Sequence, residues 1–326
     1  MSISGKLCLA AGVLVLAVSS LGISRAQDKY PSKPIRIVVA LGPGSGADAL
    51  ARFLGEYLRR DLQTEVIVEN KAGAGGIVGG EFVAKAKPDG YTMGLFHASV
   101  VTTVPAINPT VGYDSLRDFT PIATLVTNPL ALVVNASSKW TTLDQLISDA
   151  KKAPGKIGCG IIGVGSHTHF NLELLKIASG ADINRVPYSA GSGPIIAGLL
   201  GGHIDCTSLV WPAVLGQIRA GKFRALAVTS RIKEFPDIPT FASRGYPQAS
   251  LEVFFALFGP ANLPREVMEK LVPAVEKVVK DPDAEAKLEK MGFEILYEGP
   301  RQLAGRLEKE LALVRDVAKK AGVKVE

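Results

Sequence analysis

Two glycine-rich turns hold the residues of this chain that are best placed for chemistry. One turn, residues 42–48, follows a predicted strand over 35–40 and precedes a predicted helix. The second turn, residues 162–169, lies in the same way between a strand over 156–161 and a helix. Each arrangement points backbone N–H groups and the positive end of a helix at whatever lies beyond the strand, which favours an anion. Two such turns predict a clamp around an anionic ligand rather than a catalytic centre.

Side chains in and near these turns are expected to add hydrogen bonds to the ligand. Ser166 is predicted to cap its helix. Asp48 meets the positive helix end favourably, but its direct contact with an anion would be repulsive unless water or an ammonium group intervenes. We predict no catalytic residue. The candidate ligand-binding residues are Gly44, Ser45, Gly46, Ala47, Asp48, His97, Ser99, Ser166, His167, Thr168, Tyr188, Ser189 and Trp211.

The first turn also matches a nucleotide-binding pattern. Residues 42–47 satisfy the dinucleotide fingerprint G-x-G-x-x-A, and Glu69 ends the second predicted strand, where a ribose-binding acid would lie. Pro43 removes one amide that a pyrophosphate would need. An exported chain also enters a compartment where nicotinamide cofactors are not normally supplied. We therefore expect no cofactor.

His167 and His169 are the best candidates for metal or nucleophilic chemistry. Two histidines so spaced can share a metal only if further ligands complete the site, and His97 and His203 have no partner at a diagnostic spacing. Ser166 is followed by His167 and not by x-Gly, so the nucleophile elbow of serine hydrolases is missing. We predict no metal and a helix-entry loop that lines a ligand cleft.

Composition describes a well-buried globular protein. The 326 residues are 47% hydrophobic and 21% charged, which excludes a disordered chain. The formal charge of +6 comes from scattered basic residues without the clustering that nucleic acid requires. Cys159 and Cys206 lie in apolar strands, where buried free thiols are expected; a disulfide is the alternative in an oxidising compartment.

The N-terminus predicts export. Lys6 precedes an apolar run over residues 7–18, and Ser24 and Ala26 are the small residues that a signal peptidase reads. The run is shorter than the roughly 20 residues of a membrane span, so a retained anchor is the less favoured alternative. We expect residues 1–26 to be a signal peptide, cleaved after Ala26, and the mature protein to reside in the periplasm.

Predicted strands separated by single helices favour doubly wound α/β architecture with ligands beyond the carboxyl ends of the strands. A second series of alternating predicted strands and helices begins at Leu130 and ends near Thr229, so two domains are expected. We predict domain 1 from residues 27–128 plus 250–326 and domain 2 from residues 129–249. The segments 126–130 and 243–253 would cross between them and act as hinges.

Several segments together resemble one family. The chain resembles the tripartite tricarboxylate transporter substrate-binding proteins, also called the Bug family, over nearly the whole mature sequence and in the family's order. The segments that carry the resemblance are residues 42–48, 68–76, 87–92, 106–109, 185–188, 200–205 and 224–230.

This resemblance implies a two-domain periplasmic binding protein, or Venus flytrap, in which each domain is a doubly wound, mainly parallel sheet flanked by helices. It implies a monomeric receptor that captures a small mono- or dicarboxylic acid in the interdomain cleft and delivers it to a membrane permease. In this family the carboxylate is typically held by backbone amides, small hydroxyls and waters rather than by an arginine.

One departure and two alternatives remain open. Where the family often places polar residues before a proline, residues 209–212 are apolar; Trp211 would either form an apolar wall for the ligand or pack on the helix behind it. A periplasmic enzyme acting on an organic acid or ester is the alternative function. A ligand-dependent partner of a membrane sensor is another.

Overall fold

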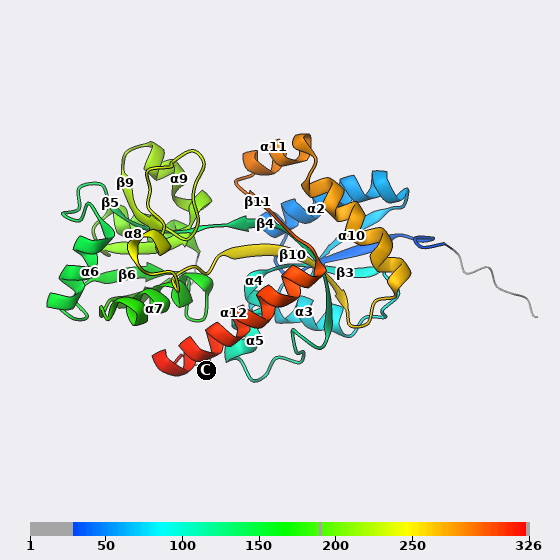
Figure 1. The fold of residues 1–326 in the computed structure, drawn as a ribbon, viewed down its shortest axis with the longest axis horizontal. Coiled ribbons are helices and arrows are strands. Elements are labelled where there is room, and N and C mark those ends of the chain that lie inside the picture. The colour runs from blue at the N-terminus through cyan, green and yellow to red at the C-terminus, as the bar shows by residue number, and fades with distance from the viewer. Residues whose placement is uncertain (1–28, 189–190, 324–326) are drawn as a thin grey trace, which may run out of the picture.

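The computed structural model describes residues 29–188 and 191–323. They form two lobes side by side, each built around one β-sheet, with two extended crossings between them (Figure 1). The predicted signal peptide and Ser189 lie outside the described residues. Within the described ranges, every helix is too short or too polar to cross a membrane.

The first lobe contains a six-stranded mixed sheet in the order β11-β4-β10-β3-β1-β2. Strand β1 pairs in parallel with β2 and β3, whereas β10 is antiparallel to both β3 and β4 and β11 is antiparallel to β4. The strands are β1 (Ile35–Val39), β2 (Val66–Asn70), β3 (Thr92–His97), β4 (Phe119–Asn128), β10 (Val253–Pro260) and β11 (Glu294–Glu298).

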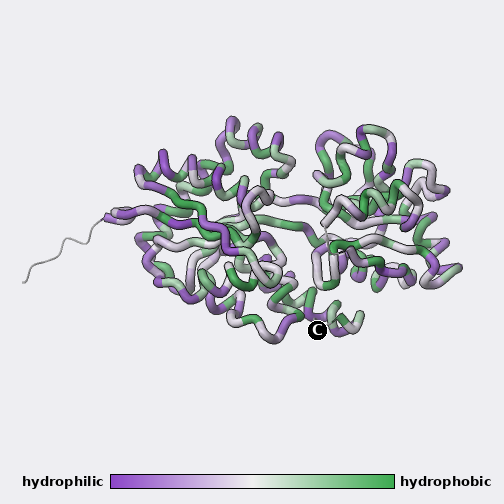
Figure 2. Tube along the Cα trace, turned by 180° about the vertical axis from the view of Figure 1, so that it is seen from behind, coloured by the Kyte–Doolittle hydropathy of each residue, from purple (hydrophilic) through white to green (hydrophobic). Residues whose placement is uncertain are grey.

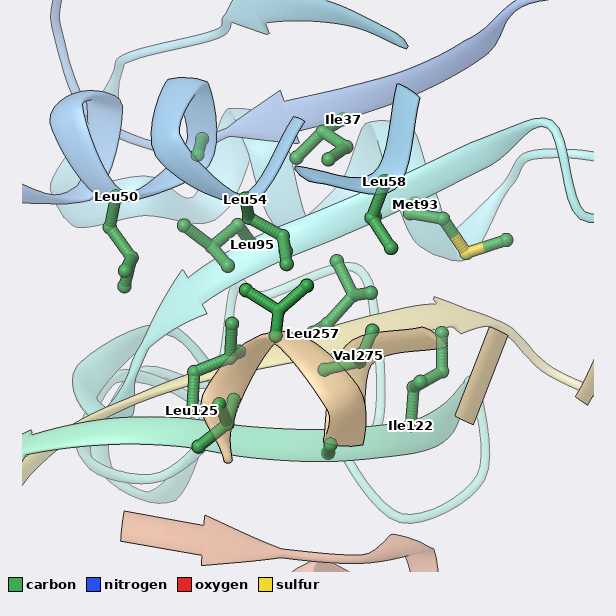
Figure 3. Packing of buried hydrophobic residues seen from close by; sticks show 14 of the residues in the cluster. Ile37, Leu50, Leu54, Leu58, Met93, Leu95, Ile122, Leu125, Leu257 and Val275 are labelled. Atoms are coloured by element: carbon green, nitrogen blue, oxygen red, sulfur yellow. The ribbon is translucent and has the colours of Figure 1, made fainter. Parts of the chain in front are cut away.

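Helices cover both faces of this sheet because its central strands are apolar on both sides. In β1, Ile37 faces the core beneath α2 and α10, and Val38 faces the opposite core beneath α3. Figure 3 shows the first core, where leucines of α2 meet strand residues and Val275 of α10. The helices are α2 (Gly46–Leu62), η1 (Ala74–Gly76), α3 (Ile77–Ala84), α4 (Ala98–Val101), α5 (Thr103–Ile107), α10 (Arg265–Val279), α11 (Pro282–Lys290) and α12 (Pro300–Ala321).

The second lobe contains a five-stranded mixed sheet in the order β7-β6-β8-β5-β9. Strand β6 is parallel to β7 and β8, and β5 is antiparallel to β8 and β9. Its strands are β5 (Leu130–Asn135), β6 (Gly158–Ile161), β7 (Asn184–Pro187), β8 (Cys206–Val210) and β9 (Phe223–Val228). Its helices are α6 (Leu143–Lys152), α7 (His167–Ser179), α8 (Ser192–Leu200), α9 (Trp211–Arg219) and η2 (Ala242–Arg244).

The parallel pairs occur in the predicted strand–helix–strand units, and most antiparallel pairs involve strands by which the chain enters or leaves a lobe. Figure 2 shows hydrophobic segments running through the middle of both lobes, with hydrophilic residues recurring along the outer helices. Cys159 and Cys206 are register partners on β6 and β8; both are buried and free, as their apolar strands predicted.

One carboxylate connects the segments that cross between the lobes. Glu252, just before β10, accepts hydrogen bonds from the hydroxyls of Thr127 in β4 (3.0 Å) and Thr229 after β9 (3.2 Å). The Thr229 hydroxyl oxygen also accepts from the amide of Leu130, the first residue of β5 (3.0 Å). Burial, together with the neighbouring charge of Glu252, raises the pKa of Glu294 to about 7. The crossings are therefore tied together by side chains as well as by sheet pairing.

Helix α12 contributes to the cores of both lobes, which the sequence analysis did not predict. Leu303 and Leu307 near its start pack in the first lobe, and Val314 and Val317 near its end pack in the second (Figure 1). Between these two pairs, Glu310 is only 8% exposed. The last turns of α12 therefore link residues that the sequence analysis had assigned to different domains.

Glu310 carries an unusual protonation equilibrium. Its Oε1 lies 3.2 Å from Nη1 of Arg306, whose Nε and Nη2 are already engaged by Glu298 at 2.7 and 2.8 Å. Burial dominates over the attraction of Arg306 and raises the pKa of Glu310 to about 7. In the unfolded chain the pKa of this carboxyl would lie near 4.5.

We expect Glu310→Gln to change how stability depends on pH. The folded protein keeps the Glu310 proton up to about pH 7, while the unfolded chain releases it near pH 4.5. The contribution of protonated Glu310 to the stability of the folded protein is therefore fully present below pH 4.5 and is lost as pH rises through 7. As the pH rises from 5 to 8, the free energy of unfolding of the variant should increase by on the order of 2–3 kcal/mol relative to that of wild type. Urea unfolding at four pH values measures this difference. Glu308→Gln, on the exposed side of the same helix, is the matched control; equal pH profiles for Glu310→Gln and wild type would refute the assignment.

Candidate functional site

The first glycine-rich turn is built as an open helix N-terminus. Ser45 has extended backbone angles (φ −71°, ψ 160°), and its hydroxyl oxygen accepts the amide of Asp48 at 3.2 Å. This bond occupies the third helical amide of α2, while the amides of Gly46 and Ala47 have no carbonyl acceptor within the helix. Gly44 has φ +80°, a conformation that favours glycine. The turn thus presents two amides without an acceptor inside the helix, at the positive end of a 17-residue helix.

Asp48 is committed to holding this turn together. Its Oδ2 accepts from the amide of Gly44 at 3.0 Å and from Nε of Arg52 at 3.1 Å. The hydrogen bond from Arg52, followed by that from Gly44, lowers the pKa of Asp48, so the carboxylate is ionised at neutral pH. Its negative charge is balanced by Arg52, which fits a role in positioning the loop.

The second turn repeats this construction at α7. Ser166 (φ −75°, ψ 164°) caps the helix as predicted, with its oxygen accepting the amide of His169 at 3.2 Å. The Ser166 hydroxyl donates to Gly163 O at 3.0 Å and lies 2.8 Å from the hydroxyl of Thr168, which accepts from the amide of Ile162 at 3.0 Å. Ser166 therefore has no remaining hydrogen-bonding capacity for a ligand. The donors that remain are the amides of His167 and Thr168, the first two helical residues.

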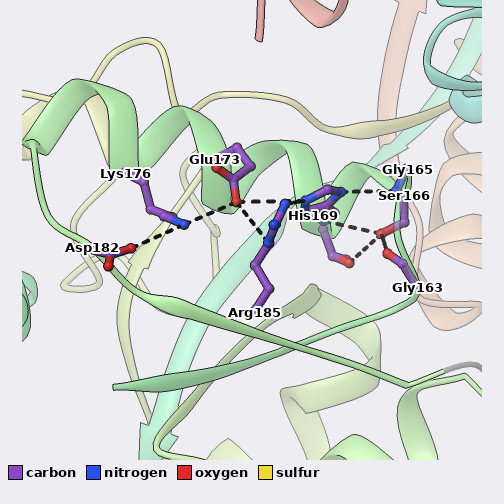
Figure 4. Close-up of polar contacts among 9 residues, drawn as sticks. Gly163, Gly165, Ser166, His169, Glu173, Lys176, Asp182 and Arg185 are labelled. Carbon is purple, nitrogen blue, oxygen red and sulfur yellow. Dashed lines mark hydrogen bonds and ion pairs between the residues drawn. The ribbon is translucent and has the colours of Figure 1, made fainter. Parts of the chain in front are cut away.

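A second layer of charged residues fixes the α7 turn (Figure 4). The amide of Gly165 donates to Nδ1 of His169 at 3.0 Å, and Nε2 of the same ring lies 3.0 Å from Nη1 of Arg185. Nε of Arg185 and Nζ of Lys176 lie 3.6 and 3.4 Å from Oε1 of the buried Glu173. Burial, followed by the charges of Arg185 and Lys176, lowers the pKa of His169 to about 4. The sequence analysis missed Glu173 and Arg185; the i,i+4 spacing of His169 and Glu173 was the only local signal.

His167 joins the two lobes. Its Nδ1 lies 2.9 Å from the hydroxyl of Ser99 and its Nε2 lies 3.4 Å from the hydroxyl of Thr102, both in or beside α4 of the first lobe. The Thr102 hydroxyl hydrogen is donated to Ala98 O at 2.8 Å, so Nε2 carries the ring hydrogen and Nδ1 accepts from Ser99. Burial, with a smaller contribution from His97, lowers the pKa of His167 to about 3. The ring is a neutral contact between the lobes.

His97 is the candidate with an unfilled hydrogen bond. It ends β3 and precedes α4, and its Nε2 is buried with no partner among the described residues. Burial lowers the pKa of His97 to about 4, which keeps the ring neutral. Because β1 and β3 are parallel neighbours, His97 and the turn at Ser45 lie at the same edge of the sheet. His167 reaches this edge from the other lobe.

The remaining candidates belong to the second lobe, and the amide of Trp211 donates to the carbonyl of Pro129 between β4 and β5 at 2.8 Å. Trp211 is 5% exposed and packs in an apolar core against Phe235, with ring centroids 5.3 Å apart. Tyr188 is half-buried and packs against the same core near Gly198. Of the two interpretations of Trp211, packing on neighbouring elements matches its surroundings. Ser189 lies outside the described residues.

The two rings of the 167–169 pair point at different partners. His167 contacts Ser99 and Thr102, whereas His169 contacts Gly165 and Arg185. Among the described residues, no group of three or more His, Cys, Asp or Glu side chains is arranged to hold a metal ion. The arrangement can present oriented amides and the Nε2 atom of the neutral His97 ring to a polar ligand.

We expect His97 and His167 to remain neutral from pH 8 down to pH 5, because burial disfavours the charged imidazolium. Long-range ¹⁵N–¹H NMR spectra recorded across this range measure both the charge and the tautomer. His167 should show hydrogen on Nε2, and Ser99→Ala should perturb the Nδ1 signal of His167 while leaving that of the exposed His203 in place. A titration midpoint above pH 5.5 for either ring would contradict this description of the site.

Comparison with known proteins gives concordant matches. The family model described as "Tripartite tricarboxylate transporter family receptor" matches residues 50–323. The Bug protein BugT of Bordetella pertussis is 33% identical over 315 residues, which cover 96% of each chain. A solved R. palustris protein with adipate is 30% identical (TM-score 0.75; 90% of this chain and 99% of that chain), and MatC from Rhodopseudomonas palustris with bound malate is 27% identical (TM-score 0.72; 88% and 99%).

Proposed function

Because the chain belongs to the tripartite tricarboxylate transporter receptor family, we propose that it captures a small organic carboxylate between its two lobes and delivers it to a membrane permease. Members of this family are solute-binding receptors, so the protein is a receptor and not an enzyme. We further propose that it is exported, is cleaved after Ala26 and acts in the periplasm as a monomer. The apolar run over residues 7–18 and the small residues before the cleavage position support the export step.

The paired helix N-termini are the observation that carries this proposal. The amides of Gly46 and Ala47 in one lobe, and of His167 and Thr168 in the other, are left over after Ser45 and Ser166 have capped their helices. Charge-assisted hydrogen bonds of this kind contribute roughly 1.5–3 kcal/mol each, so a few of them suffice for one carboxylate. At α7 the amides are the expected donors, since the Ser166 hydroxyl is fully used within its own loop.

Two similar structures and one neighbour of these amides support a proposal for the size and charge of the ligand. Adipate and malate, which two similar structures contain, are both short dicarboxylates. In this chain, the free Nε2 of His97 offers one more hydrogen bond to a second polar group of the ligand. We therefore propose a mono- or dicarboxylate whose first carboxylate meets the helix ends and whose far end reaches the His97 side of the cleft.

We expect Gly46→Pro to weaken carboxylate binding by at least tenfold. The substitution deletes one proposed donor, while proline is well tolerated at the first helical position and Ser45 already has the extended conformation that precedes proline. Gly46→Ala is the matched control: it keeps the amide and places its methyl group at ordinary van der Waals distance from Phe293. Calorimetric titration with adipate and malate gives the affinities.

Two outcomes would overturn the proposal that backbone amides hold the carboxylate. One is normal binding by Gly46→Pro. The other is equal loss of binding in Gly46→Ala and Gly46→Pro, which would indicate a steric effect of filling this position. Thermal unfolding of both variants in the absence of ligand shows whether helix α2 is intact. If wild type binds neither acid nor any other member of a carboxylate panel, the proposed function itself fails.

We also propose that ligand closes the lobes by movement about the crossing segments 126–130 and 243–253. The bonds from Thr127 and Thr229 to Glu252 lie in this region. X-ray scattering with and without a saturating carboxylate should show a smaller radius of gyration in the bound state. An unchanged radius at demonstrated saturation would argue against closure.

A further inference from the structure

A recess lies on the first lobe, away from the proposed ligand-binding residues. It has a volume of about 860 Å³ and is lined only by residues between positions 33 and 92, from β1, β2, β3, α3 and the connections between them. Arg36 and Ile67 project from the sheet, and Val78 and Phe82 project from α3. None of the candidate ligand-binding residues contributes to it. Because one lobe supplies the whole lining, closure of the cleft does not create or remove this groove.

The walls of the groove contain exposed apolar side chains. Ile67 of β2 is 50% exposed and Val78 of α3 is 48% exposed, and both line the same recess. Grouped apolar side chains at a polar rim are typical of protein interaction sites. Strand β2 is also the last strand of its sheet, so its outer edge pairs with no other strand among residues 29–188 and 191–323. Such an edge can accept an added strand.

The rim of the groove carries an excess of positive charge. Its cations are Lys33, Arg36, Lys71, Lys85 and Lys87. Glu69 is shared by Arg36 at 3.2 Å and Lys71 at 2.7 Å. Lys33 pairs with Asp89 and Lys85 with Glu81. Within the described part of the chain, Lys87 has no ion-pair partner. Five cations face three carboxylates, which leaves two positive charges for an incoming partner.

We propose that this groove is a docking site for an extended, acidic segment of a partner protein that also carries apolar side chains. The segment would add to the free edge of β2, place its apolar residues on Ile67 and Val78, and bring carboxylates to Arg36, Lys71 and Lys87. An extended chain repeats its side chains on one face about every 7 Å, so alternate residues of the segment can face Ile67 and the cations beside it. The recess is concave and is lined by residues of β1, β2, β3 and α3, so it suits a single segment better than a flat membrane surface.

Docking at this groove is independent of the bound solute. The partner would therefore hold the receptor in both its loaded and its empty states. The affinity of the segment should be the same with and without a saturating carboxylate, which separates this proposal from the proposed function of the cleft.

The test uses the full mature protein beginning at Gln27 and the peptide carboxyfluorescein-Glu-Ser-Ile-Ser-Glu-Ser-Val-Ser-Glu-amide, followed by anisotropy at low and physiological salt. In an extended conformation this peptide alternates acidic and apolar side chains along one face. We expect saturable binding by wild type and at least tenfold weaker binding by the double variant Ile67→Glu/Val78→Glu. The matched control is Ile177→Glu/Leu200→Glu, two similarly exposed apolar residues of the second lobe, which should bind like wild type. A peptide with lysine in place of glutamate should bind at least tenfold more weakly.

Lys87→Glu keeps the apolar walls and the ion pairs intact, so it tests the same site if the double variant fails to fold. It should weaken peptide binding several-fold and reduce its salt dependence. The proposal is overturned if wild type does not bind the acidic peptide, if the lysine peptide binds equally well, or if the groove variants bind like the control. It is also overturned if the groove variants instead abolish binding to phosphatidylglycerol vesicles or self-association in sedimentation.

Discussion

The hydrogen bonds from Thr127 and Thr229 to Glu252, called the Glu252 bracket below, are the interaction on which the arrangement of the two lobes depends. The chain passes from the first lobe to the second through β4 and β5, separated only by Pro129, and returns through the segment before β10. Glu252 binds the hydroxyls of Thr127 and Thr229, so a single carboxylate holds the outgoing and the returning chain. Since Thr127 pairs by register with Phe254 of β10 and Glu294 of β11, the sheet edge is fixed to the same bracket.

Ionisable groups are distributed unequally between the crossing region and the carboxyl edge of the first sheet. Acidic side chains gather at the crossings, where burial raises the pKa of both Glu294 and Glu310 to about 7. At the carboxyl edge of the first sheet, by contrast, His97 and His167 are neutral. Asp48, the acid at that edge, is neutralised by Arg52. Electrostatic attraction for an anion at this edge therefore comes from oriented amides and helix ends rather than from formal charges of these side chains.

Local patterns predicted much of this structure, and long-range contacts accounted for what they missed. The cap at Ser166 was predicted and is present. The cap at Ser45 was not predicted, although it too involves residues only three positions apart. The two α/β sheets were predictable, because strand and helix periods are local, and the family was indicated by the resemblance of segments such as residues 42–48. The bond between Ser99 and His167 joins residues 68 positions apart, and nothing in either segment specifies the other. The second half of α12 is similar: its apolar stripe indicates burial but not which lobe receives it.

The way the site divides its donors explains how a receptor of this kind would both hold and release an acid. If a carboxylate binds as proposed, each lobe contributes two amides, or about 3–6 kcal/mol of hydrogen bonding at 1.5–3 kcal/mol per bond. Association itself costs roughly 4–15 kcal/mol in lost translation and rotation. Both lobes together contribute about 6–12 kcal/mol, twice what one lobe contributes, so the ligand is held much more tightly when both lobes bind it. Opening about the Glu252 bracket would remove half of the donors at once, so release needs no competing charge and no change in protonation of His97 or His167.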